Sequence, residues 1–306
     1  MSAFPPRDPN EMPHVACIGL SALDYIWTVP RLADEGKMRA DSFATKGGGM
    51  AATAAVAVAR LGGHARFLGR AGADPEGRFM RDALEAERVD VSAFRLFEDG
   101  RSSISSVWVD RTGERRIVNF RGSGLPSDAG WLPLADIGRC GAVLSDPRWP
   151  EGTEAAFAAA RAAGIPTVLD ADMADADIFE RLLPLTDHAI FSEPALHAFA
   201  GPEDPLARVA AHGCRVTAVT RGGQGVDWIE AGERHHADAF PVAAIDTTGA
   251  GDVFHGAYAF AIAARADSRE AMSFAAAAAA LKCTRPDGRS GIPNLQDTIQ
   301  LWRSRL

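Results

Sequence analysis

Short apolar runs alternate with helix-like segments along most of the chain, and this alternation predicts an α/β fold. Residues 14–20 are apolar and end in glycine, which is typical of a buried strand. Residues 47–63 start with a glycine loop, continue as an alanine- and valine-rich helix and stop at paired glycines. We expect a further strand over 65–72 and an amphipathic helix over 74–89 with proline in its first turn.

From about residue 140 the alternation becomes regular. The apolar runs "GAVLSD", "PTVLDAD", "HAIFSE" and "VTAVTRGGQG" are separated by helical segments, and a short hairpin follows around 226–240. This order predicts a mostly parallel sheet that is covered by helices on both faces. In such sheets ligands bind outside the carboxyl ends of the strands.

Two segments do not follow this alternation of apolar runs and helical segments. Residues 102–121 alternate polar and apolar positions on either side of the turn "RTGE", which predicts a hairpin with one solvated face. Residues 27–46 are polar and extended in character. We expect both segments to form a small β lid on a single domain over 14–306, and the polar, proline-rich residues 1–13 to be a disordered leader.

Composition narrows the functional classes. The chain has 306 residues, 47% of them hydrophobic, and a formal charge of −8, so a large core is expected and a general nucleic-acid surface is not. The start of the chain has no apolar signal-peptide core, and the alanine-rich stretch near 271–281 is too short to span a bilayer. The widely spaced cysteines indicate reduced thiols. The expected compartment is the cytoplasm, with no membrane partner.

The stretch "DTTGAGD" at 246–252 carries the strongest chemical signal. It precedes the apolar run "VFHGAYAFAIAARA", so it predicts a glycine turn that opens a buried helix. The N–H groups of Gly249, Ala250, Gly251 and Asp252 would point out of that helix start, where the dipole favours an anion such as a phosphoryl group. Asp252 is placed either to accept a proton from an attacking hydroxyl or simply to cap the helix.

These motifs resemble those of the ribokinase/PfkB family of sugar kinases. "DTTGAGD" resembles the family's C-terminal signature, and "GGGMAATAAVAVARLGG" resembles its N-terminal signature. "GRAGADPEGRFM" and "VTRGGQG" occur in the family's order, and the resemblance spans about 14–295. It implies a three-layer αβα sandwich with a mostly parallel central sheet and a small β-sheet lid that closes over the sugar. It also implies ATP and Mg²⁺ as cofactors.

The resemblance assigns roles by position. Asp252 matches the catalytic base, and Gly249, Ala250 and Gly251 match the anion hole. The positions that match sugar-binding residues are Asp24, Gly48, Gly49 and Thr53, although many members have asparagine where Thr53 stands. The positions near the ATP phosphates are Thr220, Gly222 and Gly225. Asp246 and Thr248 match positions near a monovalent-cation site, which implies K⁺ for many members.

The family's N-x-x-E motif, which is linked to magnesium, is altered here. The corresponding segment is "SEPA", with Ser192 and Ala195 at the Asn and Glu positions. Glu193 remains as a carboxylate in the same segment, so we include it among the cofactor-binding candidates.

Further stretches resemble the sulfofructose kinases, a bacterial subgroup that phosphorylates 6-deoxy-6-sulfofructose at O1. These are "DEGK", "GERRIVNF", "SDPRWPEG", "FSEP" and "ALKCTRPDGRSGIP". The resemblance places Lys37, Asn119 and Arg148 around the sulfonate, a monoanion that suits an ammonium, an amide and a forked guanidinium. The same groups would also attract a phosphate.

Other interpretations stay open. The substrate is alternatively 2-keto-3-deoxygluconate, fructose or a phosphorylated ketose, and a non-catalytic sugar sensor on a kinase fold is a third possibility. His255, one turn after Asp252, is either a site residue or a packed helix histidine. The open edges of the predicted lid hairpin favour a homodimer through the lid.

Overall fold

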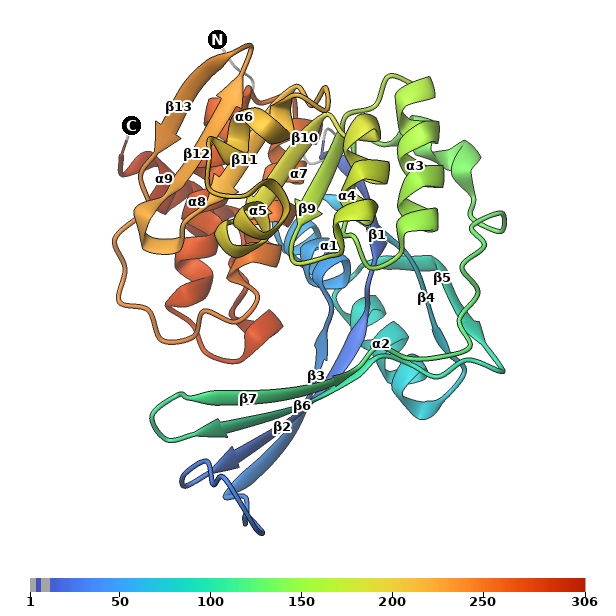
Figure 1. The fold of residues 1–306 in the computed structure, drawn as a ribbon, viewed down its shortest axis with the longest axis vertical. Helices are drawn as coiled ribbons and strands as arrows, with labels where there is room; N and C mark the ends of the chain where they lie inside the picture. Colours follow the sequence, from blue (N-terminus) through green and yellow to red (C-terminus); the bar gives the residue numbers. More distant parts are fainter. Residues whose placement is uncertain (1–3, 7–11, 306) are drawn as a thin grey trace.

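In the computed structural model, which describes residues 4–6 and 12–305, two β-sheets organise the chain (Figure 1). The larger sheet forms the body and has nine strands. In spatial order they are β13 (Glu233–Ala237), β12 (Val226–Glu230), β11 (Val216–Thr220), β10 (His188–Ser192), β9 (Thr167–Ala171), β8 (Ala142–Ser145), β1 (His14–Gly19), β4 (His64–Gly72) and β5 (Asp90–Phe97). The strands from β11 to β5 are parallel, and β12 runs antiparallel to both of its neighbours, β11 and β13.

Helices cover both faces of this sheet, so the predicted three-layer α/β architecture is confirmed. One face carries α1 (Met50–Arg60), α2 (Pro75–Ala86), α7 (Ala250–Ala263), α8 (Ser268–Cys283) and α9 (Leu295–Arg303). The other carries α3 (Pro150–Ala162), α4 (Ala176–Leu182), α5 (Glu193–Ala200) and α6 (Pro205–Ala210). Short 3₁₀ turns lie at Leu134–Arg139, Leu183–Leu185, Gly222–Gln224 and Gly288–Gly291.

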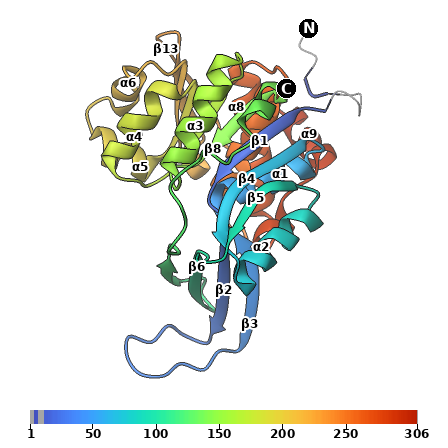
Figure 2. The same cartoon turned by 90° about the vertical axis from the view of Figure 1, so that its right-hand side faces the viewer.

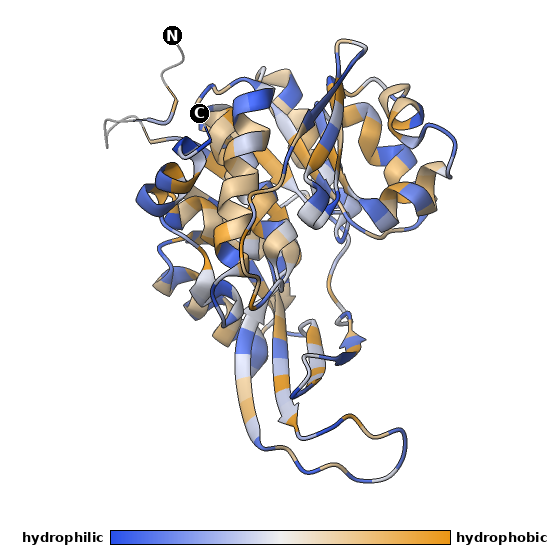
Figure 3. Ribbon diagram, turned by 90° about the vertical axis from the view of Figure 1, so that its left-hand side faces the viewer, coloured by the Kyte–Doolittle hydropathy of each residue, from blue (hydrophilic) through white to orange (hydrophobic). Residues whose placement is uncertain are grey.

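Helix α7 lies at the centre of the first helical layer. Its residues from Val253 to Ile262 are all buried, because its sequence is apolar on every side and it packs between the sheet, α1 and α8. Figure 3 shows this concentration of apolar residues inside the body. The start of α7 is therefore fixed by the core, and this position matters for the site.

The smaller sheet projects from one end of the body (Figures 1 and 2). Its strands are ordered β3 (Ser42–Gly48), β2 (Ala22–Val29), β6 (Ile104–Asp110) and β7 (Arg115–Phe120). The 102–121 segment forms the expected hairpin. Strand β2 begins at Ala22 rather than near 27, because the chain passes from β1 into β2 through Leu20 and Ser21 with no turn that the apolar pattern could reveal.

The expected disordered leader falls partly outside the described residues, which omit 1–3 and 7–11. Phe4 is described, and its ring packs edge-on against Phe274 and Trp302 with centroids 5.0 and 5.5 Å away. In the described part of the chain, Cys17, Cys140, Cys214 and Cys283 are free thiols. Over the same residues, each helix is too short or too polar to cross a bilayer.

Candidate active site

A buried carboxylate joins the elements that hold the site. Asp146 follows β8 beside β1, where the strand order of the sheet reverses, and its side chain is fully buried. It accepts hydrogen bonds from the backbone N–H groups of Leu20 (2.7 Å), Ala51 (3.0 Å) and Arg148 (2.8 Å). Burial raises the pKa of Asp146, and these three N–H groups counteract that rise. The contacts fix the end of β1 against the start of α1.

The glycine loop before α1 lies against Asp24 of the lid. Gly49 has φ 94°, and a Cβ there would lie 2.4 Å from the carbonyl oxygen of Leu20. A Cβ on Gly48 would lie 2.5 Å from an Asp24 carboxylate oxygen. Burial raises the pKa of Asp24, against a hydrogen bond from Ser105. Glycine is therefore required here for close approach to the chain and to a carboxylate.

A cavity of about 300 Å³ opens under the lid. Most of the residues that the sequence assigns to sugar, base and cation binding line it together: Asp24, Gly48, Gly49, Thr53, Asp246, Thr248, Gly249 and Asp252. The lid contributes an apolar face to the same cavity through Ile26, Val107, Val109 and Ile117. A polar floor and an apolar roof of this kind suit a sugar.

Arg289, which the sequence analysis missed, lies between the two acids of this cavity. Its Nε donates to Thr53 Oγ1 (3.1 Å) and its Nη2 to the carbonyl oxygen of Gly48 (2.6 Å). Burial lowers the pKa of Arg289 to about 10, while Asp252 and Asp24 oppose that shift. The only sequence signal was its place within "ALKCTRPDGRSGIP".

The start of α7 presents unpaired N–H groups. Gly249 is the left-handed N-cap at φ 74°. Ala250, a predicted donor, is already engaged, because its N–H donates to the carbonyl oxygen of Thr247 (3.2 Å). Among the described residues, the N–H groups of Gly251 and Asp252 have no acceptor. These two groups, rather than Ala250, are placed to bind an anion.

Asp252 lies in the first turn of the same helix and lines the lid cavity. Burial, together with the nearby Asp170, raises its pKa to about 8. His255 lies one turn on, with ring nitrogens 2.7 Å from the Gly251 oxygen and 3.1 Å from the Ile190 oxygen. These contacts favour the packed-histidine interpretation of His255.

A second, mostly apolar cavity of about 420 Å³ lies on the other side of this turn. The predicted nucleotide residues Thr220, Gly222 and Gly225 line it, together with Phe240, Phe254, Ala276, Ala279 and Ala280. Ala250 and Gly251 also line it, whereas Gly249 and Asp252 line the lid cavity. The two cavities therefore meet at the first turn of α7.

The altered N-x-x-E segment lies at the carboxyl end of β10, and Asp170 and Asp172 lie at the carboxyl end of the neighbouring strand β9. Glu193 lies outside both cavities, and its Oε1 is 3.3 Å from Nε of Arg221. Ser192 donates to Asp172 Oδ1 (3.1 Å). Oδ2 of Asp170 is buried, has no hydrogen-bond partner among the described residues and lies 3.3 Å from Nδ1 of His255. Burial raises the pKa of this acid. Asp170 and Asp172 thus offer hard oxygen donors of the kind Mg²⁺ prefers.

The three residues expected around a sulfonate do not converge in this structure. Lys37 belongs to the 30–41 loop, whose residues Gly36 and Met38 pack with Trp27 and Trp108 on the lid face opposite Asp24. The Asn119 amide donates to Ser105 Oγ (3.2 Å) at the lid cavity's edge. Arg148 Nη1 donates to the carbonyl oxygen of Met173 (2.6 Å). The role of these residues at a sulfonate therefore stays a prediction, because local motifs do not fix which lid face a loop covers.

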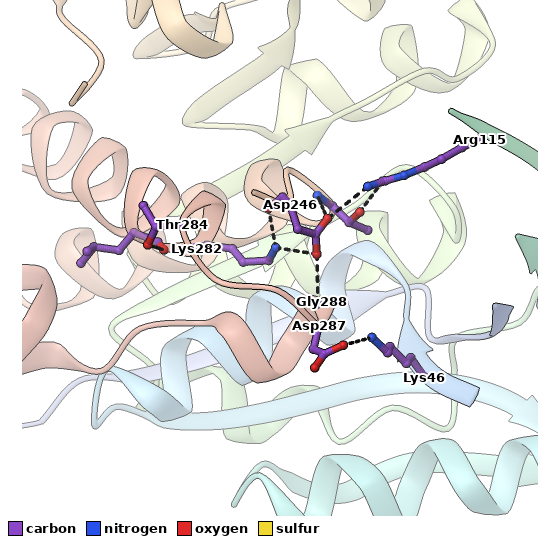
Figure 4. Close-up of polar contacts among 9 residues, drawn as sticks. Lys46, Arg115, Asp246, Lys282, Thr284, Asp287 and Gly288 are labelled. Atoms are coloured by element: carbon purple, nitrogen blue, oxygen red, sulfur yellow. Dashed lines mark hydrogen bonds and ion pairs between the residues drawn. The ribbon is translucent and has the colours of Figure 1, made fainter. Parts of the chain in front are cut away.

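Asp246 and Thr248 lie together. The groups around Asp246 do not fit a monovalent cation (Figure 4). Asp246 Oδ1 accepts from the N–H of Thr248 (3.0 Å) and from Arg115 (3.2 Å). Asp246 Oδ2 faces Lys282 Nζ (3.2 Å) and the N–H of Gly288 (3.3 Å). These donors hold the pKa of Asp246 well below its usual range, against the effect of burial. They already occupy the oxygens that a cation would need.

The chain also matches proteins of known family. Residues 12–295 match the pfkB family carbohydrate kinase model. A fructokinase of Klebsiella pneumoniae is 36% identical over 230 residues, covering 68% of this chain and 74% of that protein. A ribokinase of Haemophilus influenzae is 28% identical and covers 92% of this chain and 96% of its own length.

Solved structures agree with these matches. Arabidopsis thaliana ribokinase complexed with ribose and ATP has a TM-score of 0.86 at 25% identity, covering 95% of this chain and 99% of that one. A candidate ribokinase from Agrobacterium tumefaciens has a TM-score of 0.91 at 37% identity, covering 96% and 98%. The fold and these matches define a carbohydrate kinase. The chain belongs to the PfkB family of carbohydrate kinases.

Proposed function

We propose that this enzyme transfers the γ-phosphoryl group of ATP to a primary hydroxyl of a sugar. The observation that carries the proposal is the meeting of two cavities at one helix turn. Asp252 and Gly249 line the polar cavity under the lid, and Ala250 and Gly251 line the apolar cavity beyond it. A sugar in the first and a nucleotide in the second would bring hydroxyl and phosphate together at the N–H groups of α7.

Asp252 has the chemistry of a general base in this arrangement. With its pKa raised to about 8, its carboxylate is more basic than an ordinary one, and this favours proton transfer from a sugar hydroxyl near neutral pH. The N–H groups of Gly251 and Asp252 would stabilise the transferred phosphoryl group. Asp24 and the carbonyl oxygen of Gly48 would orient the sugar, with Arg289 between the two acids.

The apolar cavity suits the base and ribose of ATP, and Thr220, Gly222 and Gly225 would lie near the phosphates. Mg²⁺, when bound to those phosphates, neutralises the charge that develops during transfer. We assign Asp170 and Asp172 as the carboxylates that would hold it. Glu193 is the weaker choice because it already pairs with Arg221.

For the sugar itself, we propose 6-deoxy-6-sulfofructose, phosphorylated at O1, as the first candidate, on the sequence resemblance alone. Binding its sulfonate through Lys37, Asn119 and Arg148 requires the lid loop to move or a second subunit to contribute. Fructose is the second candidate. It is supported by the fructokinase relative. The lid cavity also supports it, because Lys46, Arg115 and Lys282 each already pair with an Asp there and a neutral sugar does not need a free cation.

We also propose a homodimer through the lid and a cytoplasmic location. The lid carries exposed apolar side chains at Trp27, Phe43, Val118 and Phe120, and β3 and β7 are open edges of its sheet. Such edges and apolar faces are commonly covered in proteins. A second lid is the occupant we propose, and sedimentation of the purified protein tests it.

A substrate panel tests the proposed reaction. ATP-dependent phosphorylation is measured with 6-deoxy-6-sulfofructose, fructose, ribose, 2-keto-3-deoxygluconate and fructose 6-phosphate, and ³¹P NMR locates the phosphate. Transfer to none of them would overturn the proposal. A higher kcat/KM for fructose than for sulfofructose would overturn only the choice of sugar. If sulfofructose is correct, Arg148→Ala lowers kcat/KM for it far more than for fructose.

A further inference from the structure

Lys282 is a buried cation next to the loop that leads into the anion-binding turn, Gly249–Gly251. It lies in the last turn of α8, and its side chain is 1% exposed. An ammonium group removed from water is strongly unfavourable unless it is paired and hydrogen-bonded. Hydrogen-bond acceptors should therefore surround the ammonium group. The identity of those acceptors indicates the structural role of its charge.

The acceptors all belong to Asp246. Lys282 Nζ donates to the backbone oxygen of Asp246 (2.8 Å) and faces its Oδ2 at 3.2 Å. The backbone N–H groups of Ile245 and Asp246 donate to the carbonyl oxygen of Cys283 (2.7 and 3.1 Å). The loop before α7 is thus tied to the end of α8 by both backbone and charge, as Figure 4 shows for the side chains.

The same loop fixes the anion-binding turn. Asp246 Oδ1 accepts from the N–H of Thr248, and the carbonyl oxygen of Thr247 accepts from the N–H of Ala250. Arg115 of the lid reaches both Asp246 and Thr248. The position of Gly249–Gly251 therefore depends on how Asp246 is held.

A monovalent cation would compete for the same oxygens. A carboxylate has about four acceptor sites. Those of Asp246 face Thr248 and Arg115 on one oxygen and Lys282 and Gly288 on the other. Lys282 and Arg115 are both positive, so an added cation beside Asp246 would meet like charge as well as occupied acceptors.

We infer that the Lys282 ammonium acts as the permanent cation of this loop, so that the enzyme needs no K⁺ or other monovalent cation. The cation that its family relationship implies is thereby replaced by a side chain. Lys282 is a positioning residue: it acts through Asp246 on the turn that binds the phosphoryl group. The inference concerns the loop and holds whichever sugar is the substrate.

The wild-type protein gives the decisive test. Its melting temperature and its sugar-kinase kcat are measured in KCl, NaCl and tetramethylammonium chloride at equal ionic strength. We expect both quantities to be the same in all three salts. A kcat several-fold higher in KCl, or a melting temperature raised by K⁺ over tetramethylammonium, would overturn the inference.

Lys282→Ala extends the test by removing the internal cation. In tetramethylammonium we expect kcat to fall by roughly 10- to 100-fold, because the turn is displaced. K⁺ should then raise both the melting temperature and kcat of this variant, since Asp246 regains free oxygens. A variant whose stability and activity ignore K⁺ would contradict the replacement. If Lys282→Ala does not fold, Lys282→Met, which keeps the apolar stem, takes its place.

Arg181→Ala is the matched control. Arg181 is also a cation in an ion pair, with Glu154 at 2.8 Å, but lies outside both cavities on α4. It should leave the salt response unchanged. The inference rests on the proposed function only through kcat. If no tested sugar is phosphorylated, the melting temperatures in the three salts still decide between a built-in and a bound cation.

Discussion

Asp252 and Gly251 are neighbours in the chain but face different cavities. Asp252 lines the polar space under the lid, and Gly251 lines the apolar space beside Thr220. The peptide that joins them carries an N–H with no acceptor among the described residues. A group that passes from one cavity to the other must therefore pass this N–H group.

Asp252→Asn should lower kcat by about 10²–10⁴-fold, because the amide cannot accept the proton of the sugar hydroxyl. The substitution keeps the size and shape of the side chain, so the melting temperature should not fall. A coupled ADP-release assay measures kcat, and calorimetry checks the fold. Normal turnover in a folded Asp252→Asn protein would rule out its role as the base.

The Gly251→Ala variant should be as stable as the wild-type protein but much less active. A Cβ at Gly251 meets no atom within 4 Å, so protein packing does not require glycine there, but the methyl group would enter the space assigned to the phosphoryl group. We expect kcat to fall by about 10²-fold.

Gly249→Ala provides the contrast, because Gly249 has φ 74° and alanine should cost about 1–2 kcal/mol of stability there. Thermal melts and kinetics on both variants separate the two effects. An active Gly251→Ala enzyme would show that no ligand approaches this turn.

The kcat/KM for the sugar should rise with pH through about 8. Burial raises the pKa of Asp252 to that value, and only the deprotonated form can act as a base, so activity falls about tenfold per pH unit below it. A pH profile with saturating ATP measures this. A rising limb near pH 4, the ordinary range of an Asp, would contradict the proposed environment.

Arg289→Lys should raise KM for the sugar by about tenfold or more and leave KM for ATP unchanged. Lysine keeps the charge but cannot reproduce the paired donation to Thr53 Oγ1 and the Gly48 oxygen. Arg285→Lys is a suitable control, because Arg285 lies in the same stretch but pairs with Asp297 outside both cavities. Equal effects from the two substitutions would argue against a specific role for Arg289 at the sugar.

The fold of the body was predictable because buried parallel strands and the helices that cover them have local apolar patterns in the sequence, as at 14–20 and 47–63. The turn at 246–252 was predictable because its glycines and acid sit together in sequence. The presence of Arg289 and Lys282 at the site was not predictable, because arginine and lysine are residue types that mostly lie at the surface. Arg289 is placed by contacts with Gly48 of β3 and Thr53 of α1, which lie more than two hundred positions away in the chain. Lys282 is placed by its contact with Asp246, in the loop before α7.

Lys37 is the opposite case. Its motif was clear in sequence, yet the 30–41 loop packs on the lid face opposite the cavity, with Trp27 and Trp108. A strand's two faces differ by a shift of one residue, and a loop's motif carries no information about which face it will cover.

The chain crosses between body and lid at four places, and these crossings are tied in pairs. Leu20 and Ala51, at the first two, donate to the same Asp146 carboxylate, and Arg101 and Ser123, at the other two, exchange backbone hydrogen bonds. The lid thus has a root of fixed width and a free tip. A tilt of the lid about this root would move the 30–41 loop much further than Asp24 and Gly48, which lie close to the root and to Asp252.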